Sequence, residues 1–131
     1  MKGSGITGVW EVVVEGAPFE YHVMTFHADG TMLQSNPDHG NRTSSDSNGM
    51  GTWRADGTRV RGAFVEYCVD RADPASVSRG IIRFEVEVAG DSFTGSASAT
   101  FYDLSGVARG APAPARLRGH RFDAFALLPE P

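Results

Sequence analysis

Residues 80–102, GIIRFEVEVAGDSFTGSASATFY, decide the fold, because two segments of alternating apolar and polar residues flank Gly90-Asp91. A two-residue turn at Gly90-Asp91 pairs these segments as antiparallel strands. One face of the hairpin is apolar and has the pairs Val88–Phe93, Val86–Gly95, Phe84–Ala97 and Ile82–Ala99. The other face is polar and has the pairs Glu87–Thr94, Glu85–Ser96 and Arg83–Ser98. The hairpin therefore predicts an antiparallel sheet that is buried on one face and solvated on the other.

The same alternation recurs along the chain between glycine-containing turns, as in a meandering antiparallel sheet. It predicts strands at residues 8–15, 20–27, 31–36, 50–54, 58–69, 80–89, 92–102 and 116–122. Closing about eight strands into a barrel removes the exposed sheet edges and leaves an interior for side chains or one small ligand. The sequence therefore predicts an all-β fold, a single antiparallel up-and-down barrel over residues 1–131, with frayed ends at 1–6 and 124–131.

Two Asp-Gly pairs predict the registers of two more hairpins, because Asp-Gly favours a two-residue turn. A turn at Asp56-Gly57 places Trp53 opposite Val60 and Gly51 opposite Gly62, although a bulged three-residue turn is an alternative. A turn at Asp29-Gly30 places Phe26 opposite Leu33 and Met24 opposite Ser35. By alternation, Glu66, Cys68 and His22 point into the barrel, and the tyrosines point outward at positions Tyr21, Tyr67 and Tyr102.

Composition excludes several classes of partner. The chain has 12 Lys and Arg against 16 Asp and Glu, a net charge of −4, so the main electrostatic contribution to nucleic-acid binding is missing. There is no secretion signal and no apolar run of the roughly 18 residues that a membrane span needs, so we expect a cytoplasmic protein. Cys68 is the single cysteine, and His22 and His27 fall on opposite faces of one strand. We therefore expect no disulfide, no metal site and no cofactor.

The predicted inner face contains unusually small residues, namely Gly51, Gly62, Gly95, Ala97 and Ala99. Such residues leave space in the lumen of a barrel, and the sequence therefore predicts a cavity. The alternative is that they mark strand bends or allow close packing of Trp53, Phe84 and Phe101.

Gly8-Val9-Trp10 is a G-x-W motif at the start of the first predicted strand, and Arg118 and Arg121 lie in the last one. In this combination the chain resembles the lipocalins and the wider calycin group, in which an arginine of the closing strand lies across that tryptophan. The resemblance implies a barrel that binds a small hydrophobic ligand. The chain is also similar to small cofactor-free barrels that fold or isomerise polyketide-like intermediates in bacterial secondary metabolism. Segment 103–115 is too rich in Gly and Pro for the helix that usually flanks a lipocalin barrel.

Glu66 and His22 are the candidate catalytic residues. Burial disfavours the ionised form of a carboxyl group and raises its pKa toward the range of a general acid or base. Glu66 could instead pair with Arg118, Arg121 or His22 as part of the structure, or lie at a wet rim. His22 could share a proton with Glu66 or orient a ligand carbonyl, although a structural histidine is the more common case.

Three functions follow from this pattern. The first is binding of a hydrophobic small molecule, with candidate contacts from Trp10, Met24, Phe26, Trp53, Phe64, Phe84, Phe101 and Arg121. The second is a cofactor-free cyclase, isomerase or dehydratase for a polyketide-like or terpenoid-like metabolite, in which Glu66 moves a proton. The third is a non-catalytic scaffold that forms a homodimer through its outer face. The polar stretch 35–49 is either a lid over the barrel or a surface connection.

Overall fold

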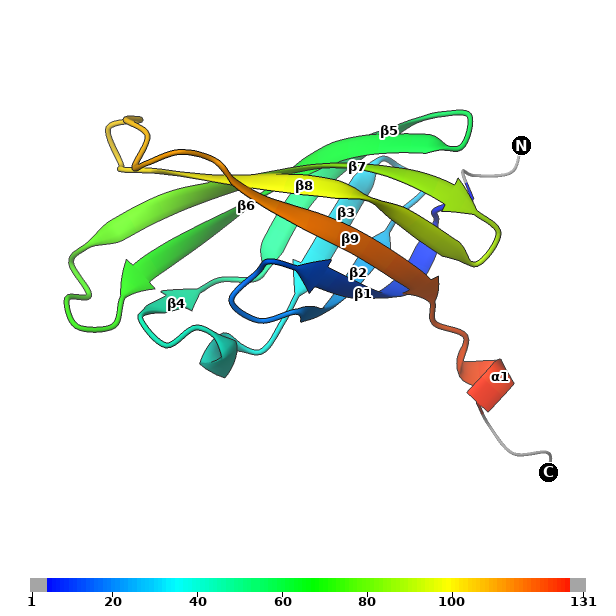
Figure 1. The fold of residues 1–131 in the computed structure, drawn as a ribbon, viewed down its shortest axis with the longest axis horizontal. Coiled ribbons are helices and arrows are strands. Elements are labelled where there is room, and N and C mark those ends of the chain that lie inside the picture. The colour runs from blue at the N-terminus through cyan, green and yellow to red at the C-terminus, as the bar shows by residue number, and fades with distance from the viewer. Residues whose placement is uncertain (1–4, 128–131) are drawn as a thin grey trace.

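The computed structural model describes residues 5–127 and is built almost entirely from β-strands (Figure 1). The strands are β1 Gly8–Glu15, β2 Tyr21–Phe26, β3 Thr31–Ser35, β4 Ser44–Asp46, β5 Gly49–Asp56, β6 Arg59–Asp70, β7 Val77–Ala89, β8 Ser92–Tyr102 and β9 Ala113–Arg121. A 3₁₀ turn, η1, spans Asp38–Gly40, and a short helix, α1, spans Ala124–Leu127.

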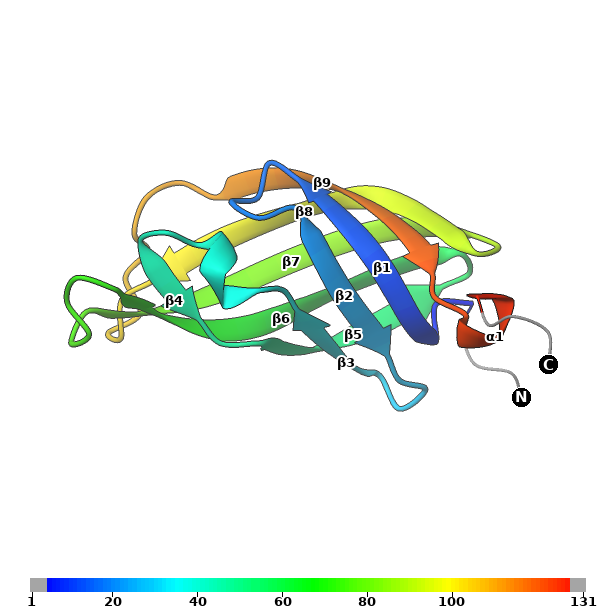
Figure 2. The same cartoon turned by 90° about the horizontal axis from the view of Figure 1, so that it is seen from below.

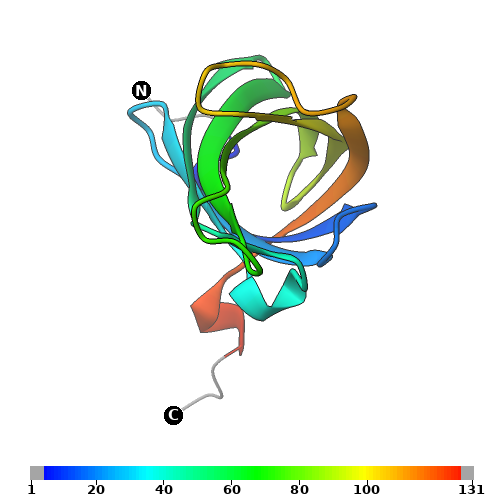
Figure 3. The same cartoon turned by 90° about the vertical axis from the view of Figure 1, so that its left-hand side faces the viewer.

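Eight of these strands form a closed antiparallel barrel. The hydrogen-bonded order runs β6-β5-β3-β2-β1-β9-β8-β7, and β7 pairs again with β6 to close the ring, which Figure 3 shows end on. The additional strand β4 pairs with the last three residues of β6, beyond the point at which the pairing with the start of β5 stops. The predicted all-β up-and-down barrel is confirmed, with β4 as an addition inside the stretch predicted as a loop.

The hairpin of β7 and β8 has the predicted register at every pair, from Ile82–Ala99 on the inner face to Glu87–Thr94 on the outer face. Its turn consists of Gly90 and Asp91, and Gly90 has a φ of +62°. A glycine with positive φ at the first turn position is what a type II′ turn requires. Segment 103–115 contains no helix; an irregular connection joins β8 to β9 over residues 103–112, and residues 113–115 already belong to β9.

The predicted register of β5 and β6 is wrong by two residues. Trp53 lies opposite Gly62 and Gly51 opposite Phe64, because the turn residues are Gly57 and Thr58 instead of Asp56 and Gly57. Gly57 has a φ of +62°, and in residues 5–127 every residue with a positive φ is a glycine. Asp56 therefore remains in the strand and pairs with Arg59. A shift of two residues preserves the faces of the strands, and Trp53 still points inward.

The predicted register of β2 and β3 is wrong by one residue, and this error exchanges the faces of β3. Phe26 lies opposite Met32 and Met24 opposite Gln34. The loop has three residues, Ala28 to Gly30, and ends on Gly30 with a φ of +90°, the usual form of a three-residue hairpin loop. Met32 and Gln34 are consequently buried, and Leu33 is 40% exposed.

One half of the barrel interior is filled by aromatic side chains. We call it the packed half; its buried residues include Ile6, Trp10, Phe26, Trp53, Phe84 and Phe93. The rings are in contact, with centroid separations of 4.8 Å for Trp10–Phe93 and 6.0 Å for Phe26–Phe84. The tight turns that join β2 to β3, β5 to β6 and β7 to β8 lie at this end of the barrel (Figure 1 and Figure 2), and they contain Gly30, Gly57 and Gly90.

The three glycines that the sequence placed on the inner face, Gly51, Gly62 and Gly95, lie in the packed half and leave no empty space. A Cβ atom at Gly62 would lie 2.6 Å from Cζ of Phe84, and one at Gly51 would lie 2.7 Å from Cβ of Phe64. At Gly95 a Cβ atom would meet the backbone of Val86 at 2.7 Å. These glycines allow close packing, which was the alternative reading of the pattern. Ala97 and Ala99 are different, because they line a cavity.

The longer connections between strands gather at the opposite end of the barrel (Figure 2). The segment between β3 and β5 carries η1 and β4 there. Arg71 anchors it by an ion pair with Asp38 at 2.9 Å and a hydrogen bond to the carbonyl oxygen of Asn41. Within the ends that were predicted to be frayed, Ile6 is fully buried and Ala124–Leu127 form the short helix α1. Residues 1–4 and 128–131 of those ends lie outside the described chain.

Candidate functional site

A cavity of about 510 Å³ occupies the half of the barrel opposite the packed half, and we call this the open half. Its apolar wall comes from β1, β7, β8 and β9 and includes Val14, Ile82, Ala97, Ala99, Phe101 and Ala115. Its polar wall comes from β2, β6 and the segment between β3 and β5 and includes His22, Asn36, Asn41, Ser44, Asp46 and Glu66. The volume lies within the range of small-molecule sites, roughly 300–1,000 Å³.

The cavity lies where β8 and β9 have alanines on their inner face. Ala97 lies opposite Ala115 and Ala99 opposite Ala113. On the β7 side their partners are Phe84 and Ile82. The short side chains of two adjacent strands therefore leave space on the β8–β9 side of the open half.

Glu66 enters the cavity from β6 on a row that crosses three strands. It pairs with Gly80 of β7, and Gly80 pairs with Phe101 of β8. A Cβ atom at Gly80 would lie 3.2 Å from Cγ of Glu66 and 2.9 Å from Cε1 of Phe101. The absence of a side chain at Gly80 therefore lets the glutamate and the aromatic ring approach each other.

The environment of Glu66 changes its acidity. Burial against the cavity wall, followed by the nearby charge of Asp46, raises the pKa of the Glu66 carboxyl to about 7. Near neutral pH this carboxyl group is divided between its protonated and ionised forms. Such a group can donate or accept a proton, as general acid–base chemistry requires.

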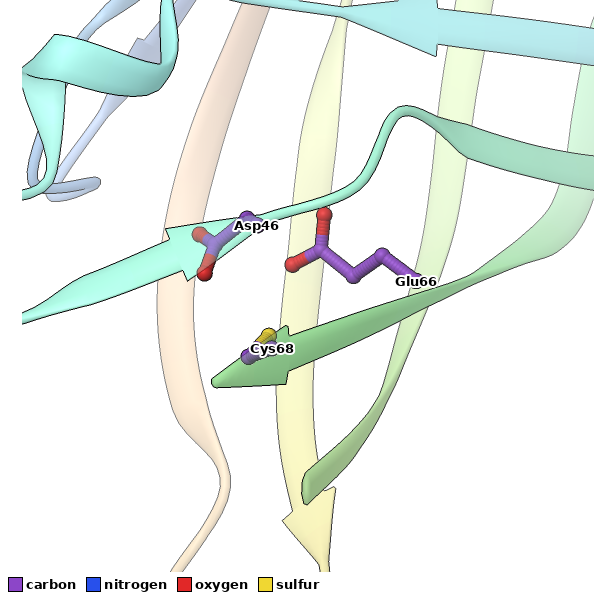
Figure 4. A group of neighbouring side chains, drawn as sticks. All are labelled: Asp46, Glu66 and Cys68. Atoms are coloured by element: carbon purple, nitrogen blue, oxygen red, sulfur yellow. The ribbon is translucent and has the colours of Figure 1, made fainter. Parts of the chain in front are cut away.

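Asp46 and Cys68 lie beside Glu66 (Figure 4). One atom from each side chain lies within 4.8 Å of the others. Asp46 is held by hydrogen bonds from Nδ2 of Asn41 at 2.6 Å and Oγ of Ser44 at 3.0 Å. Burial, the charge of Asp46 and a hydrogen bond to it raise the pKa of the Cys68 thiol well above its usual range.

Asp46, Glu66 and Cys68 offer two carboxylate oxygens and a sulfur atom within 4.8 Å of one another, a spacing that one metal ion could bridge. His22 is held by hydrogen bonds to Phe19 and Gln34 and does not join this group. Within residues 5–127 no second observation points to an ion at this place, so we assign no metal to this site.

His22 lines the polar wall as a neutral imidazole. Its Nε2 donates to the carbonyl oxygen of Phe19 at 2.7 Å, and its Nδ1 accepts from Nε2 of Gln34 at 2.8 Å. The amide nitrogen of Gln34 also donates to Oδ1 of Asn36 at 2.7 Å, which fixes the orientation of the amide. Burial lowers the pKa of His22, although the hydrogen bond to Phe19 opposes this effect. The ring is held in one tautomer.

The structure brings together three of the candidate residues from the sequence, because Glu66, His22 and Phe101 all line the cavity. The other candidates lie elsewhere in the barrel, mostly in the packed half, and none of them lines the cavity: Trp10, Met24, Phe26, Trp53, Phe64, Phe84 and Arg121. Tyr21 and Tyr67 are exposed on the outer face, as predicted.

Arg121 has a structural position at the end of the packed half. Its guanidinium carbon lies 4.5 Å from the centre of the Trp10 ring, and its Nη1 donates to the carbonyl oxygen of Thr7 at 2.7 Å. Its Nε also forms an ion pair with Asp91 at 2.9 Å. The side chain thereby joins the start of β1 to the β7–β8 turn.

Sequence reasoning missed Asp46, Asn41 and Phe19 as cavity residues. Asp46 lies in the polar stretch 35–49, where no alternation indicates a strand or a face. The one available signal was the length of that stretch, since long connections often border a site. The cavity residues Ala113, Pro114 and Ala115 were similarly hidden in a segment predicted as a connection.

Fold and site together define a small closed antiparallel β-barrel with a cavity in one half. A comparison with protein-family models, curated proteins and solved structures finds no match to this chain. No helix in the described part of the chain has the length and apolar character needed to cross a bilayer.

Proposed function

We propose that this protein binds a hydrophobic small molecule in the cavity of the open half. The observation that carries the proposal is a space of about 510 Å³ whose wall on β7, β8 and β9 is apolar. Burial of a ligand against such a wall contributes roughly 25 cal/mol for each Å² of apolar surface removed from water. The few polar side chains on the opposite wall would fix the orientation of the ligand.

A neutral apolar dye, Nile red, tests this proposal by fluorescence titration, because its emission rises in apolar surroundings. Ala99→Phe places a ring in the cavity, and we expect it to weaken dye binding at least tenfold. Ser96→Phe is the matched control, since it places the same ring at an exposed outer position of β8. No saturable binding to the unchanged protein, or equal binding to Ala99→Phe, would contradict the proposal.

We also propose that the barrel is lipocalin-like. The support is the contact of Arg121, on the last strand, with Trp10, on the first strand. This pair has the arrangement that the G-x-W resemblance implies. Arg118, the other arginine considered, is exposed and lies 3.6 Å from Glu15 in a surface ion pair.

A second candidate function is a cofactor-free cyclase, isomerase or dehydratase for a polyketide-like or terpenoid-like metabolite. The observation that favours it is the position of Glu66 in the cavity with a pKa of about 7. A carboxylate base of this kind removes a proton from carbon more readily when apolar walls exclude water. Phe101 and the alanines of β8 and β9 would hold the substrate against it.

The substrate 5-nitrobenzisoxazole tests Glu66 as a base without knowledge of the natural substrate. The base removes the proton on C3, that electron pair forms the nitrile, and the N–O bond breaks to give 2-cyano-4-nitrophenolate. We expect a rate above that of equimolar acetate, with a midpoint near pH 7, and its loss in Glu66→Gln. A rate equal to that of acetate would contradict the enzymatic candidate and leave the binding proposal standing.

A further inference from the structure

The charged groups of the cavity are of one sign. The titratable side chains that line it are Glu66, Asp46, Cys68 and His22, with no lysine or arginine among the lining residues. His22 is neutral in its hydrogen-bonded state, and Cys68 remains a thiol. Arg71, at the rim, is already paired with Asp38. The two carboxyl groups therefore face the cavity without a protein cation.

The Glu66 carboxyl has no partner in the described part of the protein. Within residues 5–127 it makes no hydrogen bond or ion pair. Asp46, beside it, accepts hydrogen bonds from Asn41 and Ser44. A carboxylate that borders the cavity without a donor favours a ligand that supplies N–H groups.

The spacing of the two carboxyl groups suits one nitrogen donor. An N⁺–H group lies about 2.8 Å from a carboxylate oxygen, so one nitrogen can contact two oxygens that are up to about 5.6 Å apart. One oxygen of Asp46 and one of Glu66 lie within 4.8 Å of each other, and Figure 4 shows the Glu66 carboxyl pointing toward Asp46. Ala99 and Phe101 of β8 offer an apolar surface to the remainder of the ligand.

We infer that the ligand of this cavity is a hydrophobic amine, whose protonated nitrogen lies between Glu66 and Asp46 and whose apolar part packs on the β8–β9 wall. This inference rests on the proposed binding function and specifies its ligand class. The apolar wall distinguishes an organic ammonium from a bare metal ion, which would use the carboxylates and leave the wall uncovered.

The acidity of Glu66 adds a measurable consequence. An ammonium group stabilises the ionised carboxylate, so its binding releases the proton that Glu66 carries near neutral pH. With a pKa of about 7, we expect release of about 0.8 proton at pH 6.5 and about 0.2 at pH 7.5. Asp46 carries the second charge in the same space, and the neutral His22 takes no part.

The experiment compares 1-naphthylmethylamine with 1-naphthylmethanol, which share their ring system and differ in charge. At pH 7.5 calorimetry should give at least tenfold tighter binding for the amine. The difference should fall below threefold in Glu66→Gln and in Asp46→Asn. Glu85→Gln is the control, because it removes the same charge from the outer face and should preserve the tenfold difference. Titrations at pH 6.5 in phosphate and in imidazole measure the proton release.

The outcomes separate the two proposals. If the alcohol binds and the amine binds no tighter, the amine inference is overturned and the binding function stands. If the difference persists in both Glu66→Gln and Asp46→Asn, the inference is also overturned. Binding of Zn²⁺ or Ca²⁺ alone, in competition with the amine, would replace it with a metal site. If neither naphthyl compound binds, both proposals fail.

Discussion

The two halves of this barrel are made from the same strands but have opposite interiors. In the packed half, small inner residues lie under aromatic rings, as Gly62 lies under Phe84 and Gly119 under Phe93. In the open half, the small residues Ala97 and Ala99 face a cavity. Ala97 and Ala99 have alanine partners on β9, although Phe84 and Ile82 lie opposite them on β7. Small residues on two adjacent strands therefore indicate free volume, whereas a single small residue does not.

Removal of an aromatic ring should be costly in the packed half and inexpensive in the open half. Phe84→Ala should lower the free energy of unfolding by about 3–5 kcal/mol, because the ring leaves a cavity among close-packed side chains. Phe101→Ala, whose ring already borders free space, should cost about 1 kcal/mol. Urea unfolding followed by the fluorescence of Trp10 and Trp53 measures both. Equal losses would mean that the halves are packed alike.

The second prediction concerns stability and pH. Glu66 is protonated in both the folded and unfolded states below its ordinary pKa of 4.5. Between pH 4.5 and about 7 the unfolded chain loses this proton while the folded protein keeps it, so stability falls as pH rises. Glu66→Gln removes this loss, and its free energy of unfolding should exceed that of the unchanged protein by roughly 3 kcal/mol at pH 8.

The difference between the two proteins should vanish near pH 4, where the carboxyl is neutral in both states. Urea unfolding at pH 4, 6 and 8 provides the comparison. A difference that is constant across these pH values would contradict the assigned environment of Glu66, since a packing effect of glutamine would not follow the titration.

The third prediction concerns substitutions that enlarge a small inner side chain in each half of the barrel. Gly62→Ala should cost about 1–3 kcal/mol, because its Cβ atom would lie 2.6 Å from the ring of Phe84. Ala99→Val adds two methyl groups at an inner position of the open half and should change stability by less than about 0.5 kcal/mol. Thermal and urea unfolding measure these effects. A large loss for Ala99→Val would show that the open half has no free space.

The smallest expected effect concerns the end of the packed half. Arg121→Ala should lower the free energy of unfolding by about 1–2 kcal/mol, because it removes the contact with Trp10 and the hydrogen bond to Thr7. Arg118→Ala, which removes an exposed ion pair with Glu15, should cost below about 0.5 kcal/mol. The reverse order would contradict the assignment of Arg121 as the arginine that covers the tryptophan.

The parts of the fold that followed from sequence were those with clear alternation. The register and the turn of the β7–β8 hairpin were predicted to the residue, whereas β7 begins three residues before its predicted start. The registers at the two Asp-Gly sequences were harder to predict, because the length of the turn depends on whether the glycine is its first or its last residue. Gly57 begins a two-residue turn, whereas Gly30 ends a three-residue loop. This one difference changed the buried face of β3.

The sequence predicted those side chains of the candidate site whose direction follows from alternation along a strand. It did not predict those that reach the site through contacts between segments far apart in the chain. The inward position of Glu66 follows from its strand, and its raised pKa follows from burial. Its neighbour Asp46 lies in β4, which pairs with β6. The sequence around β4 has no alternation of apolar and polar residues that would predict this strand. The sequence also does not show where along the barrel the packed half ends and the cavity begins. Trp10 and Phe26 lie in the core, and Phe101 lies at the cavity.

A crystal structure determined under xenon pressure tests most directly whether the barrel is hollow in one half alone. Xenon occupies apolar spaces that protein atoms leave empty. We predict xenon beside Ala97, Ala99 and Ile82, and none among Phe26, Phe84 and Phe93. Protein side chains that fill the space between Ala99 and Glu66, or xenon confined to the aromatic half, would contradict the account.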